Sequence, residues 1–391
     1  MRRRPFPPLA RVLGLLVVVV GAFTALGLAV LWPSGDAPDL SGSTAGLDYV
    51  DAQVTAVEVV GCTDPAEGLP TECQAVSVRV SSGPDEGEPA TFFSSLADFR
   101  APSFSAGDRL VLVYNRLAPA PFQYVFVEFQ RDTPLLLLGL AFVLVVVAFG
   151  RWKGVRALAG LGVSLAVIVG FLLPSLLRDH NAIAVALVTT SVVAFASLYL
   201  AHGVSAATTV ALLGTLTSVV AIALLANVMA AAARLTGLSG ESFQVLRVTA
   251  EAIEPRGILI AGVVIGALGV LDDVTVTQVS AVTELRRAKP DLSRRDLYRS
   301  AIRIGRDHVA STVNTLVLAY VGASLALMLF FLQEGRSITQ VLGREVVAIE
   351  VVRMLVGSIG LILSVPLTTW LAVVAGVTSD TDGHGHGSSS S

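Results

Sequence analysis

The sequence predicts an α-helical integral membrane protein with about eight transmembrane helices and a small all-β extracytoplasmic domain between the first and second helices. Of the 391 residues, 53% are hydrophobic and only 15% are charged, whereas soluble domains carry roughly 25% charged residues. Mean hydropathy is +0.73. Eight stretches are apolar and long enough to cross about 30 Å of hydrocarbon; they lie near residues 12–32, 134–150, 155–174, 181–201, 204–228, 257–280, 308–331 and 352–376.

Basic residues predict the orientation of these spans. One cluster, which includes Arg2–Arg4, precedes the first span; Arg151, Lys153 and Arg156 separate the second from the third; a third cluster follows the sixth span. All three fall on one face of the membrane, which the positive-inside rule makes cytoplasmic. Both termini are therefore expected on the cytoplasmic side of a bacterial cytoplasmic membrane. Nucleic-acid binding is not expected, because the largest basic cluster lies in a short loop between two spans.

The spans divide the chain into five parts. Residues 1–32 are a cytoplasmic N-terminus with a signal-anchor helix, although a cleaved signal peptide is the alternative. Residues 33–48 are a Pro/Gly/Ser-rich linker, and 49–131 form the extracytoplasmic domain. Residues 132–376 make a seven-helix transmembrane bundle, and 377–391 a disordered tail.

The extracytoplasmic domain contains short β-branched and aromatic runs separated by Gly, Pro and Asp turns, typical of a small β-sandwich or barrel. Cys62 and Cys73 are the two cysteines of the chain. In an oxidising compartment they are expected to form a disulfide; two free buried thiols are the alternative. The domain lacks His, and we expect a docking or gating module whose substrate or protein partner the sequence does not identify.

Two adjacent carboxylates, Asp272 and Asp273, lie within the sixth span. A carboxylate at the centre of a spanning helix costs roughly 2.5–3.5 kcal/mol on insertion scales. Two neighbouring negative charges are also unfavourable, so at least one is expected to hold a proton. The pair is therefore a candidate proton or ion site; a structural, hydrogen-bonded role is the alternative.

Helical spacing adds polar or small stripes on three consecutive spans. Such faces are expected to meet in the bundle interior, where small residues allow close approach. Cytoplasmic-interface positions for Glu284 and His308, and an ordinary ion pair between Glu350 and Arg353, are the alternatives. The supporting residues are Thr277, Ser280 and Glu284 with Asp273, then His308, Thr312, Asn314 and Thr315, then Glu350 and Arg353.

The connection after the sixth span predicts a cytoplasmic amphipathic helix near 293–306 that leads into the seventh span. Pro290 breaks the preceding helix, and Ser293 with Asp296 has the spacing of a capping box. We expect this helix to lie at the cytoplasmic interface, where its basic residues touch anionic lipids.

The segments GALGVLDDVTVTQVSAVTEL, IGRDHVASTVNTLVLAYVGASL and EVVRMLVGSIGLILSVPLTT resemble the YibE/F-like family of bacterial multi-pass membrane proteins, over roughly residues 130–376. The resemblance implies a multi-span protein for which transport is at most suggested. The pattern of the sixth and seventh spans, G-x-x-DD-x-TV, then ELRR, a cytoplasmic amphipathic helix and A-STV-NTL, is also similar to the resistance–nodulation–division superfamily and to the protein-export subunits SecD and SecF. That similarity implies a proton site at Asp272 and Asp273, faced by Thr312 and Thr315. The chain departs from it in having eight spans, a small exported domain and no Lys in the seventh span.

The leading expectation is an ion-coupled, proton-driven transporter or export component. A non-catalytic membrane scaffold or receptor acting through its extracytoplasmic domain is the alternative. An enzyme is not expected, since no second Asp lies deep in another span as an aspartyl protease requires. Neither a metal nor another cofactor is expected: the five His are scattered except in the tail. The lipid bilayer is the expected partner, and homo-oligomerisation is left open.

Overall fold

The chain folds into two compact units, one made of Met1–Pro38 with Val146–Ser391 and the other of Asp39–Val145. The computed structural model describes residues 8–34, 47–63, 70–95, 102–119, 122–178, 180–238, 254–333, 335 and 337–377. Most of the predicted linker, from residue 35 to 46, and the tail from residue 378 lie outside the described residues.

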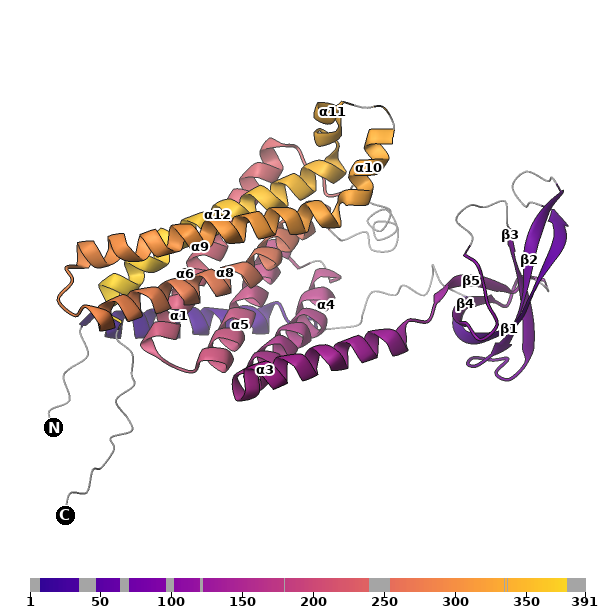
Figure 1. Ribbon diagram of the computed structural model, residues 1–391, viewed down its shortest axis with the longest axis horizontal. Coiled ribbons are helices and arrows are strands. Elements are labelled where there is room, and N and C mark those ends of the chain that lie inside the picture. The colour runs from indigo at the N-terminus through magenta and orange to yellow at the C-terminus, as the bar shows by residue number, and fades with distance from the viewer. Residues whose placement is uncertain are drawn as a thin grey trace, which may run out of the picture. The chain divides into compact units, whose positions relative to one another are not determined.

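Long apolar helices make up the first unit (Figure 1). Six helices of the described chain are long and apolar enough to cross a membrane, or seven if the bent pair α9 and α10 is one span. The predicted combination of apolar helices and a small antiparallel sheet is confirmed, and the count of eight spans stays a prediction. The helices are α1 (Pro8–Val30), α3 (Asp132–Val167), π-helix η1 (Ile168–Leu172), α4 (Leu173–Leu176), α5 (Ala182–His202), α6 (Ala206–Ala232), α8 (Pro255–Ala288), α9 (Arg294–Ala323), α10 (Leu325–Gln333), α11 (Ile338–Leu342) and α12 (Glu345–Ala375).

Helix α3 is interrupted at Arg151, whose φ of 49° and ψ of −132° are not helical. A Cβ added to Gly154 would meet the carbonyl oxygen of Val146. These residues are eight apart, which in a straight helix separates them by about 12 Å. The chain therefore reverses at Arg151, and glycine at 154 allows the close approach that this reversal needs.

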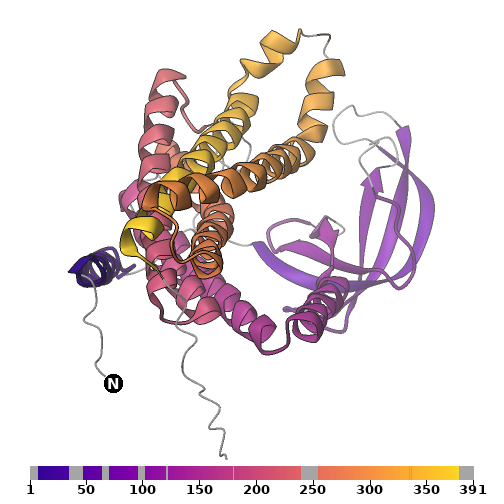
Figure 2. The same cartoon turned by 60° about the vertical axis from the view of Figure 1, so that its left-hand side comes forward.

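Helices α5, α8 and α12 run in the same direction. Ser197 on α5 bonds Asp272 on α8, and 15 residues earlier on both helices Ala182 lies against Gly257. Gln278 on α8 bonds Thr369 on α12, and 16 residues earlier on both helices Gly262 lies beside Arg353. Helices α6 and α9 run the opposite way: Gly214 and Ile222 of α6 lie against Thr368 and Gly360 of α12, and Gly305 and Leu316 of α9 lie against Val365 and Gly357 of α12. Figure 2 shows these helices from a second side. We call the "basic end" the end of this unit where α5, α8 and α12 finish and α6 and α9 begin; it carries Arg286, Arg287 and Arg294.

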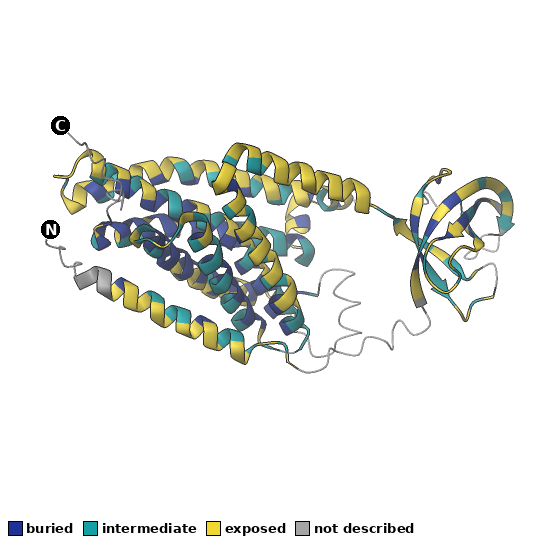
Figure 3. Cartoon of the chain, turned by 90° about the horizontal axis from the view of Figure 1, so that it is seen from below, coloured by how far each residue is buried: buried dark blue, intermediate teal, exposed yellow. Residues whose placement is uncertain are grey.

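Small residues bring the central helices together. The Thr368 hydroxyl on α12 lies directly against Gly214 on α6, and the Ile222 side chain of α6 fills the space above Gly360 of α12. Buried residues concentrate at the centre of this unit, along α6, α8 and α12 (Figure 3). Backbones approach closely where glycine leaves room, which is the usual packing of membrane helices.

The helices of this unit extend beyond the predicted spans. Ser293 caps α9, which continues unbroken from the predicted amphipathic segment near 293–306 to Ala323, because nothing after Pro290 interrupts the helical hydrogen bonds. The interfacial position of its first half stays a prediction. The predicted span 308–331 is instead bent by 55° between α9 and α10. Helix α8 extends past residue 280 to Ala288.

The second unit is a five-stranded antiparallel sheet of order β3-β2-β1-β4-β5. Phe92 on β3 and Phe126 on β5 stack with their ring centroids 6.3 Å apart, so the two edge strands approach and the sheet curls into a partly open barrel. This strand order around a barrel is that of the OB-fold. The strands are β1 (Leu47–Thr63), β2 (Pro70–Val80), β3 (Pro89–Ser95), β4 (Arg109–Asn115) and β5 (Tyr124–Phe129).

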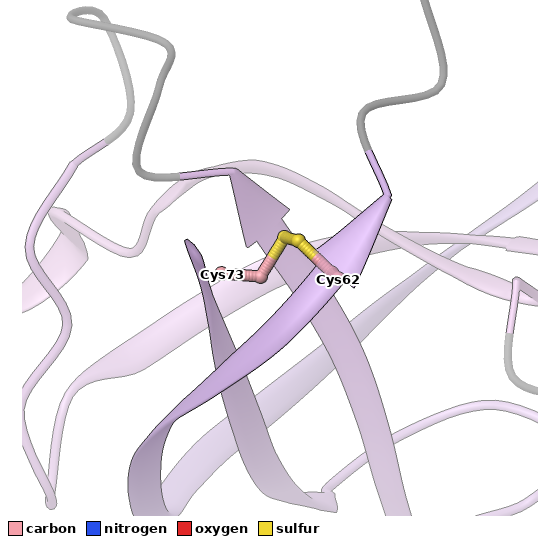
Figure 4. Close-up of a disulfide and its surroundings, with 2 residues drawn as sticks. All are labelled: Cys62 and Cys73. Atoms are coloured by element: carbon pink, nitrogen blue, oxygen red, sulfur yellow. A yellow bond between two sulfur atoms is a disulfide. The ribbon is translucent and has the colours of Figure 1, made fainter. Parts of the chain in front are cut away.

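A disulfide joins Cys62 near the end of β1 to Cys73 near the start of β2 (Figure 4). The Cα atoms are 5.8 Å apart and the two residues are separated by 11 positions. The bond crosses the β1–β2 ladder diagonally, because Cys73 pairs with Val60 and Cys62 with Thr71. It therefore fixes the two longest strands where they leave the sheet.

We expect Cys62→Ser to lower the stability of the barrel by about 2–3 kcal/mol, because the disulfide restricts the unfolded chain, and a loop of this short length gives a stabilisation of that size. Hydrogen–deuterium exchange in the full chain would measure this, as exchange about 30- to 150-fold faster in β1 and β2. Exchange in α5 and α6 serves as the internal control. Unchanged exchange in the strands would mean that the disulfide contributes nothing to the barrel.

Candidate functional site

Asp272 lies in the middle of α8, where α5 and α6 pack against it. The Ser197 hydroxyl of α5 donates a hydrogen bond to Asp272 Oδ2 at 2.7 Å. The other oxygen, Oδ1, is buried and makes no hydrogen bond of normal geometry within the described residues, although the Thr215 hydroxyl lies beside the carboxyl group. A buried, unpaired carboxylate oxygen is costly, so this side chain is the least satisfied acidic group in the described centre of the bundle.

Two buried threonine hydroxyls continue this polar site toward α6. Thr215 Oγ1 on α6 and Thr275 Oγ1 on α8 lie 2.8 Å apart. Thr275 also donates to the main-chain oxygen of Asp272 at 3.2 Å. The site therefore combines one carboxylate with hydroxyls from three helices, and its polar atoms are all oxygens.

Asp273 points away from this site. Its side chain is 71% exposed, and its Oδ2 atom lies 3.9 Å from His308 Nε2 on α9. Successive residues of a helix differ by about 100° in direction, so neighbouring aspartates enter different surroundings. The two carboxylates that the sequence presents as a pair thus have separate partners, Ser197 for Asp272 and His308 for Asp273.

A small cavity lies one to two helical turns from Asp272 toward the basic end. It has a volume of about 160 Å³ and is lined by α5, α6 and α8. Polar groups in its wall include His202, Ser205, Thr208 and Ser280. The volume is sufficient for several water molecules, and the polar wall supplies partners for them. Ser280, a predicted supporting residue, therefore faces this cavity.

The rest of the stripe predicted on α8 does not line the bundle interior. Asp273 and Glu284 are exposed, while Thr277 is half-buried. Glu284 forms an exposed ion pair with Arg287 at 3.1 Å. The interior face of α8 is instead the one through Thr275 and Thr283, both buried. This stripe begins at Asp272 and has the same helical period.

On α9 the predicted stripe divides in the same way. His308 and Thr312 are half-buried, whereas Asn314 and Thr315 are exposed. Thr312 donates to the His308 carbonyl and Thr315 to the Ser311 carbonyl. Both hydroxyls thus satisfy their own helix and do not face Asp272, contrary to the similarity with SecD and SecF.

On α12 the small residues of the stripe lie against neighbouring helices. Gly357, Gly360 and Ser364 are buried. Glu350 and Arg353 form a partly buried ion pair, with Arg353 Nη1 2.8 Å from Glu350 Oε1. Arg353 also extends toward Gly262 of α8. This pair lies near the end of the unit opposite the basic end, away from Asp272.

Gln278 is a central polar residue that the sequence interpretation missed. Its Nε2 donates to the Ala301 carbonyl of α9 at 2.9 Å and to Thr369 Oγ1 of α12 at 2.7 Å. Gly305 of α9 lies directly against its Oε1. Gln278 thus ties three helices together. A glutamine within an apolar span is itself the signal that could have identified it.

No group of three or more His, Cys, Asp or Glu side chains converges on a point that could hold a metal ion, as far as the structure describes the chain. The Asp272 site therefore offers a single carboxylate together with hydroxyl oxygens.

Comparison with known proteins gives one match. Neither a curated protein nor a solved structure matches the chain. The family model described as YibE/F-like protein matches residues 138–376, which include the Asp272 site, the cavity beside it and helices α5 to α12. The chain belongs to the YibE/F-like family.

Proposed function

We propose that this protein is a proton-coupled membrane transporter or export component in which Asp272 takes up and releases the coupling proton. The observation that carries the proposal is the state of the Asp272 carboxyl group. One oxygen is held by Ser197, and the other is buried and makes no hydrogen bond of normal geometry within the described residues. Intramembrane carboxylates of this kind commonly belong to ion pathways.

Protonation of Asp272 would change its interactions with the surrounding helices. The charged form needs donors at both oxygens, whereas the neutral form can donate through one oxygen to a nearby acceptor. The Thr215 hydroxyl lies beside the carboxyl group and is bonded in turn to the Thr275 hydroxyl, so it can provide such an acceptor. Binding of a proton would thus favour one arrangement of α5, α6 and α8 over another, which is what coupling requires.

The cavity beside Asp272 supports a proton route from the basic end. Its wall begins one turn from Asp272, at Val276, and becomes polar further toward the basic end, at Ser280 and Ser205. Under the positive-inside rule the basic end is cytoplasmic. We therefore propose that Asp272 exchanges protons with the cytoplasm through this cavity, in a bacterial cytoplasmic membrane.

The proposed orientation includes eight crossings. Helix α3 provides two of them because the chain reverses at Arg151. Helices α9 and α10 together provide one bent crossing. Both ends of the chain are then cytoplasmic, and the β-barrel lies outside the cell, where its disulfide can form.

Infrared difference spectroscopy on the purified protein in lipid tests the role of Asp272. We expect a protonated-carboxyl band that appears as the pH falls through the physiological range, is lost in Asp272→Asn and is retained in Asp273→Asn. Glu284→Gln is a matched control, since it removes an exposed carboxylate from the same helix. Spectra of the wild type and Asp272→Asn that respond identically to pH would refute the proton role.

The alternative is a non-catalytic scaffold or receptor, and one observation favours it. Phe93 on β3 with Val125 and Val127 on β5 are exposed apolar side chains of the two edge strands that meet in the barrel. Exposed apolar side chains that gather on one face are typical of a binding surface. A scaffold would bind its partner with equal affinity in the wild type and Asp272→Asn.

A further inference from the structure

An apolar groove runs along the surface between α9 and α12. Its volume is about 550 Å³. Two polar or charged side chains, Tyr298 and Arg306, border it; the rest of its wall is apolar and includes Val309, Val313 and Ile362. The groove lies on the other side of α9 from Asp273 and is distinct from the Asp272 site and its cavity.

The polar groups of the groove lie toward the basic end. Tyr298 is in the second turn of α9, which begins at the basic end, and Val313 is deeper in the bundle. Because every Cα–Cβ bond in a helix tilts toward its N-terminus, the Arg306 side chain also extends in that direction. Its long aliphatic stem can follow the apolar wall while the guanidinium group reaches the membrane surface.

The length of the groove matches one leaflet of a bilayer. From Tyr298 to Val313 is 15 residues, or about 22 Å along a helix. Half of the hydrocarbon core is about 15 Å thick, and the headgroup region adds several ångströms. One end of the groove can therefore accept a headgroup while the other accepts an acyl chain.

Two features of the backbone shape the floor of the groove. Gly305 lets α9 approach the Val365 side chain of α12, because a Cβ there would overlap it. Pro366 lies within α12 and lacks the N–H that would bind the Ile362 carbonyl. Both residues line the groove, so its shape follows from residues that are unusual inside a helix.

The charge around the polar end favours an anion. Arginines with exposed side chains recur along the same helix as Arg306, over the first four turns; they are Arg294, Arg295, Arg299 and Arg303. Basic pockets between spanning helices on the cytoplasmic side are typical sites for anionic lipid headgroups. The apolar remainder of the groove suits an acyl chain better than a soluble phosphate compound.

We propose that this groove binds one anionic phospholipid from the leaflet at the basic end. The headgroup phosphate binds Arg306 and Tyr298, and an acyl chain lies along Val309, Val313 and Ile362. The site stands independently of the proton role of Asp272. A lipid bound there packs against both α9 and α12 and so stabilises their contact.

Tryptophan quenching by brominated lipids tests this site. The chain has three Trp residues, Trp32, Trp152 and Trp370; Trp370 is exposed on α12, one turn beyond Pro366. In a Trp32→Phe, Trp152→Phe background, Trp370 alone reports contact. The protein is placed in phosphatidylcholine vesicles that contain a minor fraction of either dibrominated phosphatidylglycerol or dibrominated phosphatidylcholine. We expect phosphatidylglycerol to be preferred about fivefold over phosphatidylcholine. One basic residue, Arg306, contributes about 1 kcal/mol to binding an anionic lipid, which corresponds to that factor.

Two variants separate the site from general surface charge. Arg306→Gln is expected to reduce the preference for phosphatidylglycerol to near onefold. Arg294→Gln removes the same charge from the first turn of α9, about 18 Å away, and is expected to keep most of the preference. Ala310→Phe fills the groove and should lower quenching by both lipids. Equal quenching by the two lipids in the unsubstituted background, equal losses in both arginine variants, or unchanged quenching in Ala310→Phe would each overturn the proposal.

Discussion

Gly360→Val is expected to destabilise the helical unit by about 3 kcal/mol or more, because it adds a side chain where none fits. Gly360 on α12 is buried, and the Cγ1 and Cδ1 atoms of the Ile222 side chain on α6 occupy the place of its missing Cβ. Ile222 is itself fully buried, so it cannot turn away without displacing its own neighbours. Helices α6 and α12 would have to separate.

Thermal unfolding in detergent, followed by size-exclusion chromatography after heating, measures this effect. Gly269→Val is the matched control, since nothing lies within 4 Å of the Cβ position at Gly269 on α8. There the same substitution should leave the midpoint unchanged or slightly raised, because valine favours a helix more than glycine does. If both variants unfold at the same temperature, the close contact between α6 and α12 does not contribute to stability.

The elements of both units could be predicted from the sequence because each has a strong local signal. Apolar runs of about 20 residues can satisfy their backbone in lipid only as helices. The strands follow β-branched runs between turn residues, and the sheet spans them all, from β1 at Leu47 to β5 at Phe129. Helix ends were less predictable: the polar first half of α9 suggested an interfacial helix that leads into a span, and the sequence did not show that both parts form one continuous helix to Ala323.

The direction in which each polar stripe faces could not be predicted in the same way. In water a polar stripe marks the exposed face of a helix, but in a membrane nearly every face of a span is apolar. The sequence therefore gives two equivalent stripes on α8, one through Asp273 and Glu284 and one through Asp272 and Thr283. Only packing against α5 and α6 distinguishes them, and it buries the second.

The hydrogen-bond partners of Asp272 could not be predicted from a local sequence pattern either. Ser197 is 75 positions away and Thr215 contacts Thr275 across 60 positions. A serine or threonine in a spanning helix usually bonds its own backbone, as Thr190 and Ser218 do. The sequence gives no sign of which hydroxyl instead reaches a carboxylate on another helix.

Asp272 and Gln278, two polar residues of α8 that bond neighbouring helices, should respond oppositely to substitution, and this contrast separates a functional group from a structural one. Asp272→Asn is expected to raise the thermal stability of the protein. It removes a charge whose burial costs roughly 2.5–3.5 kcal/mol on insertion scales and keeps the shape of the side chain. The Ser197 hydroxyl, which now donates to Oδ2, can rotate to accept from the amide.

Gln278→Leu is expected to lower stability by about 1–3 kcal/mol, because it leaves the Ala301 carbonyl and the Thr369 hydroxyl without their shared donor. Unlike Oδ1 of Asp272, both polar ends of Gln278 already contact neighbouring helices. Thermal unfolding midpoints of the two single variants and the wild type, measured in the same lipid, distinguish a functional from a structural role of Asp272. Residues kept for activity commonly reduce stability, so a stabilised Asp272→Asn supports the proton role. Destabilisation by both substitutions would make Asp272 a structural residue like Gln278, and the proposed proton site would lose its main support.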